Sequence, residues 1–161
     1  MLYYDIILSP IGQLLILLGD KGLKRILFED QISTANIPNE WQKNPKRLKA
    51  VTKQLHAYFD QKLTKYNLNL NPDGTEFQKK IWTHLLDIPF GELRSYRDIA
   101  KAIGNPNACR AVGMAISKNP IPIIVPCHRV IGKNGKLTGY AGGIDIKIKL
   151  LKIEGFNRNN E

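Results

Sequence analysis

The sequence predicts an α+β protein of two domains: a small one with a three-stranded antiparallel sheet and a helix, then a mostly helical one. Three observations predict this class. Three apolar runs separated by turn residues open the chain, a helical periodicity begins at residue 46, and the break Asn71-Pro72-Asp73-Gly74 precedes a series of capped helices. We therefore expect domains at residues 1–73 and 74–161.

The first domain is expected to begin as an antiparallel meander. Its strands cover residues 2–8, 13–18 and 23–29, and the segments SPIG and GDKG between them are typical of turns. Residues 31–45 contain two prolines and several polar groups, which predict a loop. From residue 46 the apolar positions follow one helical stripe, formed by Leu48, Val51, Leu55, Tyr58 and Phe59. The stretch 63–70 ends in an alternation that is compatible with a short strand.

The second domain opens with a helix signal. Thr75 and Gln78 have the spacing of a capping box, and the buried face of the helix is predicted to hold Phe77, Ile81, Trp82 and Leu85. Ser95 with Asp98 predicts a second capped helix, and residues 108–117 predict a third after a glycine-containing turn. Two short helices joined in this way indicate a helix-turn-helix, although many such corners never touch DNA. A last helix is expected over residues 145–154.

The third helix of this domain carries small residues around Arg110. They are Ala108, Ala111, Gly113 and Ala115. Such a face lets a helix approach a nucleic-acid groove closely, and it equally lets two helices pack tightly. The basic surroundings favour the groove.

Charge is concentrated in the second domain. The chain has a net charge of +10, and residues 74–161 hold 14 Lys/Arg against 7 Asp/Glu. Residues 94–136 hold eight basic residues against Asp98 alone. This density indicates a polyanionic partner, with nucleic acid as the first candidate. A solvated basic surface is the alternative.

Composition excludes several other classes. No apolar run approaches the roughly 20 residues that span a bilayer, and the amino terminus lacks the features of a signal peptide. We therefore expect a soluble, cytoplasmic protein that does not contact membranes. The only cysteines, Cys109 and Cys127, and three scattered histidines lack the spacing of a zinc site, so we predict no metal. Two free thiols are expected in an intracellular chain, although the sequence leaves a disulfide open.

Cys127 is the predicted chemical centre. It follows the apolar, proline-rich run NPIPIIVP, which is expected to be extended and buried, and it precedes His128 and Arg129. A cysteine beside such a run is commonly just a small core residue. An adjacent imidazole instead predicts a thiolate nucleophile with a base, coupled through a water or a helical turn because neighbours on a strand point apart. Glu154 is preferred to Asp145 as the group that orients the base.

Glycine-rich loops follow the cysteine at residues 132–135 and 138–143. They predict the wall of a pocket for a flat ligand, or else an ordinary hairpin with its connector.

Two long segments carry a family resemblance. The segments PCHRVIGKNGKLTGYAGG and FQKKIWTHLLDIPFGELRSYRDIAKAIGNPNACRAVGMA resemble the carboxy-terminal domain of the O6-alkylguanine-DNA alkyltransferases, and the match extends over residues 75–155. The resemblance implies a winged-helix/helix-turn-helix alkyltransferase domain. Residues 1–74 resemble the family's ribonuclease-H-like domain in length and element pattern only. No cofactor is implied, and the implied partner is double-stranded DNA containing O6-alkylguanine, bound by a monomer that needs no protein partner and is nucleoid-associated when on DNA.

The resemblance also implies residue roles. Cys127 would accept the alkyl group irreversibly, His128 would act as a base through water, Glu154 would orient it, and Asn119 would hold the turn behind the site. Tyr96 would lie beside the rotating phosphate and help protonate the guanine, while Arg110 would fill the space left in the base stack. Further DNA-binding residues would be Ser95, Ala111, Gly113 and Arg129, and the pocket would be lined by Pro122, Val125, Tyr140, Ala141 and Gly142.

Three questions stay open at this point. A Cys-His hydrolase and a non-catalytic sensor of alkylated DNA are alternatives to the alkyl transfer. O4-alkylthymine is an open second substrate.

Overall fold

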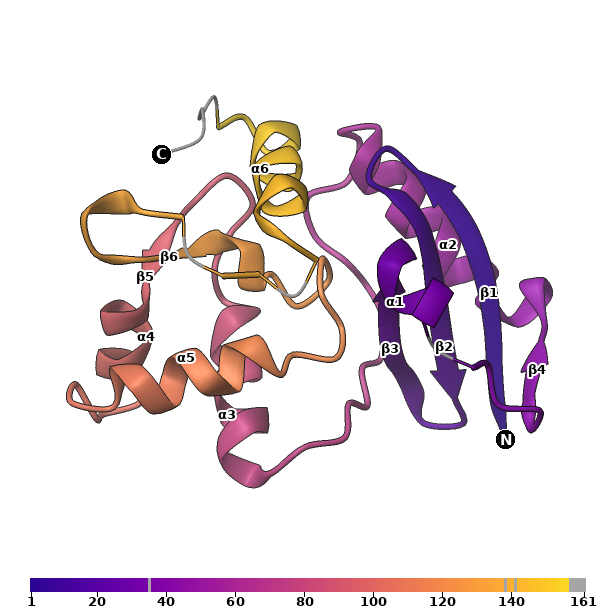
Figure 1. The fold of residues 1–161 in the computed structure, drawn as a ribbon, viewed down its shortest axis with the longest axis horizontal. Coiled ribbons are helices and arrows are strands. Elements are labelled where there is room, and N and C mark those ends of the chain that lie inside the picture. Colours follow the sequence, from indigo (N-terminus) through magenta and orange to yellow (C-terminus); the bar gives the residue numbers. More distant parts are fainter. Residues whose placement is uncertain (35, 138, 141, 157–161) are drawn as a thin grey trace. The chain divides into compact units, whose positions relative to one another are not determined.

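The computed structural model describes residues 1–34, 36–137, 139–140 and 142–156. The chain divides into two compact units, Met1–Asp73 and Gly74–Glu161, which are drawn in Figure 1. The first contains a sheet and helices and the second is mostly helical, so the α+β class is confirmed. Among the described residues, no helix is both long and apolar enough to cross a membrane.

The sheet of the first unit has the strand order β3-β2-β1-β4. Strands β1 (Leu2–Ser9), β2 (Gly12–Gly19) and β3 (Gly22–Phe28) form the predicted antiparallel meander. The tight turn before β3 requires glycine, because Gly22 has a φ of +140° and a Cβ there would lie 2.6 Å from the carbonyl oxygen of Asn69.

The expected number of three strands is wrong, because β4 (Trp41–Lys43) pairs in parallel with β1. The segment 31–45, expected to be a loop, also contains the end of α1 (Glu29–Thr34). A three-residue strand has no periodicity that a sequence could reveal, and its pairing depends on a partner far along the chain. The stretch 63–70, whose alternating apolar residues were compatible with a short strand, contributes an isolated β-bridge between Leu70 and Leu23.

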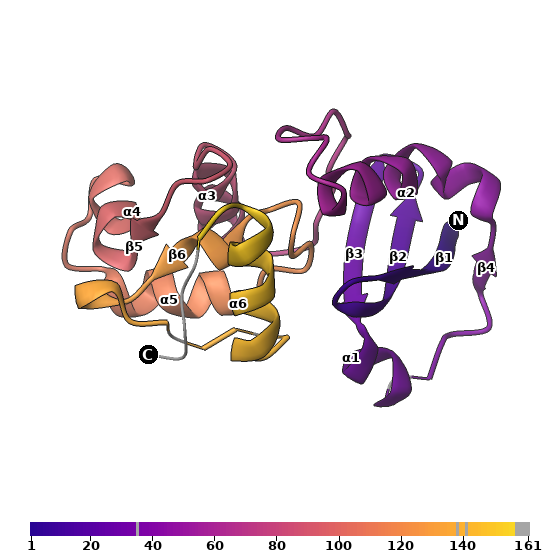
Figure 2. The same cartoon turned by 90° about the horizontal axis from the view of Figure 1, so that it is seen from above.

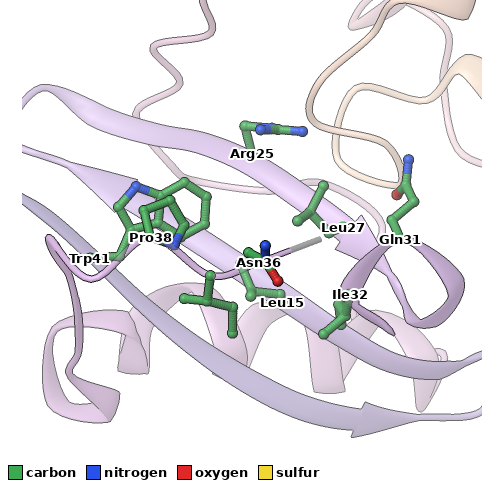
Figure 3. Close-up of a pocket in the computed structure, with 9 residues that line it drawn as sticks. Leu15, Arg25, Leu27, Gln31, Ile32, Asn36, Pro38 and Trp41 are labelled. Atoms are coloured by element: carbon green, nitrogen blue, oxygen red, sulfur yellow. The ribbon is translucent and has the colours of Figure 1, made fainter. Parts of the chain in front are cut away.

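Helix α2 (Pro45–Phe59) buries the five predicted apolar residues and lies along one face of the sheet (Figure 2). On the other face, Leu15, Leu17 and Leu27 pack with Ile32 of α1 and with Trp41. That face has a hollow of about 290 Å³ (Figure 3), whose lining includes no thiol, imidazole or carboxylate. It therefore has none of the groups that nucleophilic chemistry requires.

The second unit begins with α3 (Glu76–Leu85), β5 (Arg94–Ser95), α4 (Tyr96–Ala102) and α5 (Cys109–Ser117). Both predicted capping boxes are confirmed: the Thr75 hydroxyl accepts from the backbone N–H of Gln78, and Ser95 accepts from that of Asp98. The remaining elements are the 3-10 turns η1 (Cys127–Arg129) and η2 (Lys133–Gly135), strand β6 (Val130–Ile131) and helix α6 (Ile144–Ile153).

Helix α3 is anchored to α5 by a buried hydrogen bond. The indole N–H of Trp82 donates to the carbonyl of Ala115 at 2.8 Å. Phe77 is not buried as predicted, since 38% of it is exposed. Helix α5 also packs on α4 (Figure 1), and because it buries Val112, Ala115 and Ile116 it leaves its opposite side to solvent.

Candidate active site

The segment before Cys127 is folded into turns, so the expectation of an extended chain is wrong, although its burial is as expected. Ile123 has a φ of +75°, an unusual conformation for a β-branched residue. The side chain of Asn119 supports the turn: its Nδ2 donates to the carbonyl of Val125 at 2.9 Å, and its Oδ1 accepts from the N–H of Ile121 at 3.0 Å. Asn119 therefore fixes the backbone that leads to Cys127.

Cys127 begins the 3-10 turn η1 and is only 7% exposed. Pro122 and Val125, two of the predicted pocket residues, are buried in the preceding turn. Burial raises the pKa of the Cys127 thiol, while a hydrogen bond from Asn119, the positive charge of Lys147 and a hydrogen bond from Tyr140 act to lower it. The site thus combines a low-dielectric surrounding with three groups that favour the thiolate.

His128 and Glu154 form a fully buried pair. Nε2 of His128 lies 2.5 Å from Oε2 of Glu154, which follows the end of α6. Burial lowers the pKa of His128, and the bond to Glu154 opposes that shift. The other ring nitrogen, Nδ1, is buried and has no hydrogen-bond partner among the described residues. The imidazole is therefore oriented through one nitrogen and has the other available for a proton.

Arg129 does not have the predicted role. It was expected to contact DNA, but only 5% of it is exposed. Its Nε donates to Oε1 of Glu154 at 2.7 Å and its Nη1 to the carbonyl of Ile88 at 2.6 Å. The guanidinium instead neutralises the buried carboxylate, because a charge that has left water needs a partner of opposite sign.

Sequence reasoning missed Lys147, whose positive charge acts on the Cys127 thiol. Lys147 is 1% exposed, and its Nζ donates to the carbonyl of Val130 at 2.7 Å. Burial lowers the pKa of this lysine to about 8, against the opposing influence of Cys127. A signal was present, because Lys147 lies on the same helical stripe as Leu150, Leu151 and Glu154.

The predicted DNA-contacting residues cluster around α4 and α5. Arg110 and Ala111 are exposed on α5. A Cβ at Gly113 would lie 3.8 Å from the ring of Tyr96, the first residue of α4. Ser95 uses its hydroxyl as the cap of α4, where it accepts from the backbone N–H of Asp98 at 3.0 Å. The structure thus brings these five residues onto neighbouring elements.

The predicted pocket wall is described only in part. Tyr140 acts to lower the pKa of the Cys127 thiol, and Gly142 is half-buried. Ala141 lies outside the described residues.

The other cysteine, Cys109, is half-buried and lines a separate hollow of about 560 Å³ between α4 and η2. The structure records both cysteines as free thiols. The described part of the chain holds no group of three or more His, Cys, Asp or Glu side chains that could bind a metal ion.

Comparison with known proteins gives matches along almost the whole chain. Residues 76–156 match the family model "6-O-methylguanine DNA methyltransferase, DNA binding domain", and residues 2–72 match its "ribonuclease-like domain". The methylated-DNA–protein-cysteine methyltransferase of Methanosarcina mazei is 54% identical over 156 residues, which cover 97% of this chain and 99% of that protein.

Solved structures agree with the sequence comparison. The crystal structure of Mycobacterium tuberculosis OGT in complex with DNA superposes with a TM-score of 0.87 at 46% identity, covering 94% of this chain and 92% of that chain. The O6-methylguanine-DNA methyltransferase of Pyrococcus kodakaraensis gives a TM-score of 0.68 at 26% identity, over 97% of this chain and 100% of that chain.

Proposed function

The chain belongs to the family of 6-O-methylguanine DNA methyltransferases, and from that premise we propose that it removes the alkyl group from O6-alkylguanine in duplex DNA and keeps it on Cys127. One observation carries the proposal. Burial raises the pKa of the Cys127 thiol while three nearby side chains act to lower it, and the residue that follows Cys127 is half of a buried His128–Glu154 pair.

The chemistry is a displacement at the alkyl carbon. Sγ of Cys127 forms a bond to that carbon, the bond from carbon to O6 breaks, and its electron pair stays on the guanine. The thiol proton passes to Nδ1 of His128, through a water, and Tyr96 donates a proton to the departing guanine. Because the product is a thioether, which water does not hydrolyse, each protein molecule acts once.

The base has to leave the duplex before this reaction. The O6 atom of a stacked base cannot reach a buried thiol, and rotation of the nucleotide costs a few kcal/mol. The exposed side of α5, with Arg110 and small neighbours, fits a surface that enters a groove and fills the space left by the base. Basic residues around it would bind the phosphates.

The test is single-turnover transfer from duplex DNA that carries labelled O6-methylguanine. We expect close to one labelled methyl group per protein, found by mass spectrometry on the tryptic peptide of Cys127. Cys127→Ser should abolish the transfer, whereas Cys109→Ser, which removes the other free thiol, should leave it intact. Transfer to Cys109, or transfer that survives loss of Cys127, would contradict the proposal.

The alternatives predict different fates of the label. A Cys-His hydrolase would release label into solution over many turnovers. A non-catalytic lesion sensor would bind the DNA and leave the label there. We also propose that the protein acts as a monomer on intracellular DNA, which a single sedimenting species at one protein per short duplex would support.

A further inference from the structure

The excess of positive over negative charge in the first unit comes from one segment. Residues 41–59 hold five basic residues and no Asp or Glu. The remainder of residues 1–73 holds five basic and seven acidic residues. The segment consists of β4 and α2 with the link between them, so the unit has one basic helix on an otherwise slightly acidic body.

Three of these cations form a stripe on α2. Lys46, Lys49 and Lys53 are spaced three and four residues apart, which places them on one side of a helix. All three are exposed, and the face that α2 buries against the sheet is formed by other residues. The stripe extends about 10 Å along the helix axis, at about 1.5 Å per residue.

In the part of the chain that the structure describes, the lysines of the stripe have no compensating partner. Among the described residues, none of their ammonium groups has an ion pair or a hydrogen bond. Like charges at this spacing destabilise a helix. A local arrangement that opposes folding without compensation is typical of a surface kept for binding.

A further cation and an aromatic ring lie at the start of the same helix. The guanidinium of Arg47 stacks on the ring of Tyr3, 4.4 Å from its centroid, while the side chain of Asn44 caps the backbone N–H of Arg47. Because the ring holds the guanidinium without neutralising it, the positive charge stays available to an anion beside the stripe.

We propose that the stripe Lys46-Lys49-Lys53 is a second DNA-binding surface, which contacts the phosphate backbone of duplex DNA from the first unit. Its length matches about three phosphate intervals of one strand, each about 3.4 Å along the duplex axis. The contact is independent of sequence, because lysine meets phosphate as a point charge. This inference rests on the proposed function, which assigns DNA binding to the second unit alone.

The experiment measures how DNA affinity depends on salt in the full-length protein. The variant Lys46→Gln/Lys49→Gln/Lys53→Gln is compared with Lys21→Gln/Lys62→Gln/Lys65→Gln, which removes the same charge from exposed positions elsewhere in the same unit. Affinity for a long unmodified duplex is followed by fluorescence anisotropy from low to physiological salt. Circular dichroism melting establishes that both variants are folded.

The slope of log K against log salt is negative, and each lost phosphate contact reduces its magnitude by about 0.9. We therefore expect the magnitude of the slope to be smaller by about 1 to 3 in the stripe variant than in the wild type. In the control variant it should stay near the wild-type value. Equal slopes for the wild type and the stripe variant, or equal losses in both variants, would overturn the inference. Failure of the wild type to take up label from O6-methylguanine DNA would instead contradict the proposed function, so the two failures are distinguishable.

Discussion

Nε2 of His128 and Oε2 of Glu154 lie 2.5 Å apart, and neither side chain is exposed. The same carboxylate accepts from Nε of Arg129 and from the backbone N–H of Gly91. Glu154 thus joins the turn of the nucleophile, the end of α6 and the loop after α3. These donors fix the carboxylate in place, and through it the imidazole is held in one orientation.

Replacement of Glu154 should be costly to the fold. Glu154→Ala leaves the buried guanidinium of Arg129 without its partner, and loss of one member of a buried pair costs about 3–5 kcal/mol. The matched control is Glu92→Ala, which breaks the exposed pair with Arg94 and should cost no more than about 1 kcal/mol. Urea unfolding measures both. Similar costs would mean that burial of the Glu154 pair is energetically unimportant.

Lys147 predicts a dependence of stability on pH. Its pKa in the folded protein is about 8, well below the ordinary value of 10.5. Between these values the unfolded chain binds more protons than the folded one, so this lysine makes stability rise with pH from about 8 to 10.5. The gain is at most about 3.5 kcal/mol, at about 1.4 kcal/mol for each pH unit.

Lys147→Met should remove that rise, whereas Lys149→Met, which changes an exposed lysine of the same helix, should retain it. Denaturant unfolding at several pH values between 7 and 10 provides the comparison. Lys147→Met should also raise the pKa of Cys127, because it removes a positive charge that favours the thiolate. The pH profile of Cys127 alkylation by iodoacetamide should then move to higher pH. An unchanged profile would show that Lys147 does not assist the thiolate.

The sequence predicted the features that depend on neighbours along the chain. The capping boxes at Thr75 and Ser95 and the apolar stripe of α2 involve residues three or four positions apart, so the pattern and the structure agree. β4 was missed because its partner strand lies some 40 residues earlier and three residues carry no period.

For the site as well, the sequence predicted some residues correctly and missed the placement of others. Cys127 and His128 could be selected because they are adjacent in the chain, and Glu154 because it ends a predicted helix. The burial of Arg129 could not be predicted, since charged residues are mostly exposed unless a partner supplied by the tertiary fold neutralises or hydrogen-bonds them. For Lys147 the one sign in the sequence was its place on the apolar stripe of α6. Both were therefore assigned to the surface or left out.

Substitution of Gly113 is predicted to stabilise the protein, unlike that of Glu154. Gly113 lies inside α5, where glycine costs about 1 kcal/mol relative to alanine. A Cβ there would meet the ring of Tyr96 at an ordinary contact distance of 3.8 Å. Gly113→Ala should therefore raise the free energy of unfolding by about 0.5–1 kcal/mol. If close approach to DNA requires the glycine, the variant should also bind DNA more weakly, and a thermal melt together with a binding titration tests both parts. A lower melting temperature would mean that the ring of Tyr96 cannot accommodate the methyl group.

Arg110 provides the sharpest test of how the base leaves the duplex. Its side chain is exposed at the start of α5, so Arg110→Ala should change the free energy of unfolding by less than about 0.5 kcal/mol. If the guanidinium fills the space left by the rotated nucleotide, the variant loses rate only where a base has to be unstacked. We expect single-turnover repair of duplex DNA to slow by about tenfold or more, and repair of the same lesion in single-stranded DNA to change little, because an unpaired base costs less to extrude.

The control variant is Arg97→Ala, which removes an equal charge from an exposed position on α4. It should weaken the binding of duplex and single-stranded substrates to a similar extent, because only phosphate binding is lost. If Arg110→Ala also slows both substrates equally, Arg110 is a phosphate contact and the insertion role is wrong.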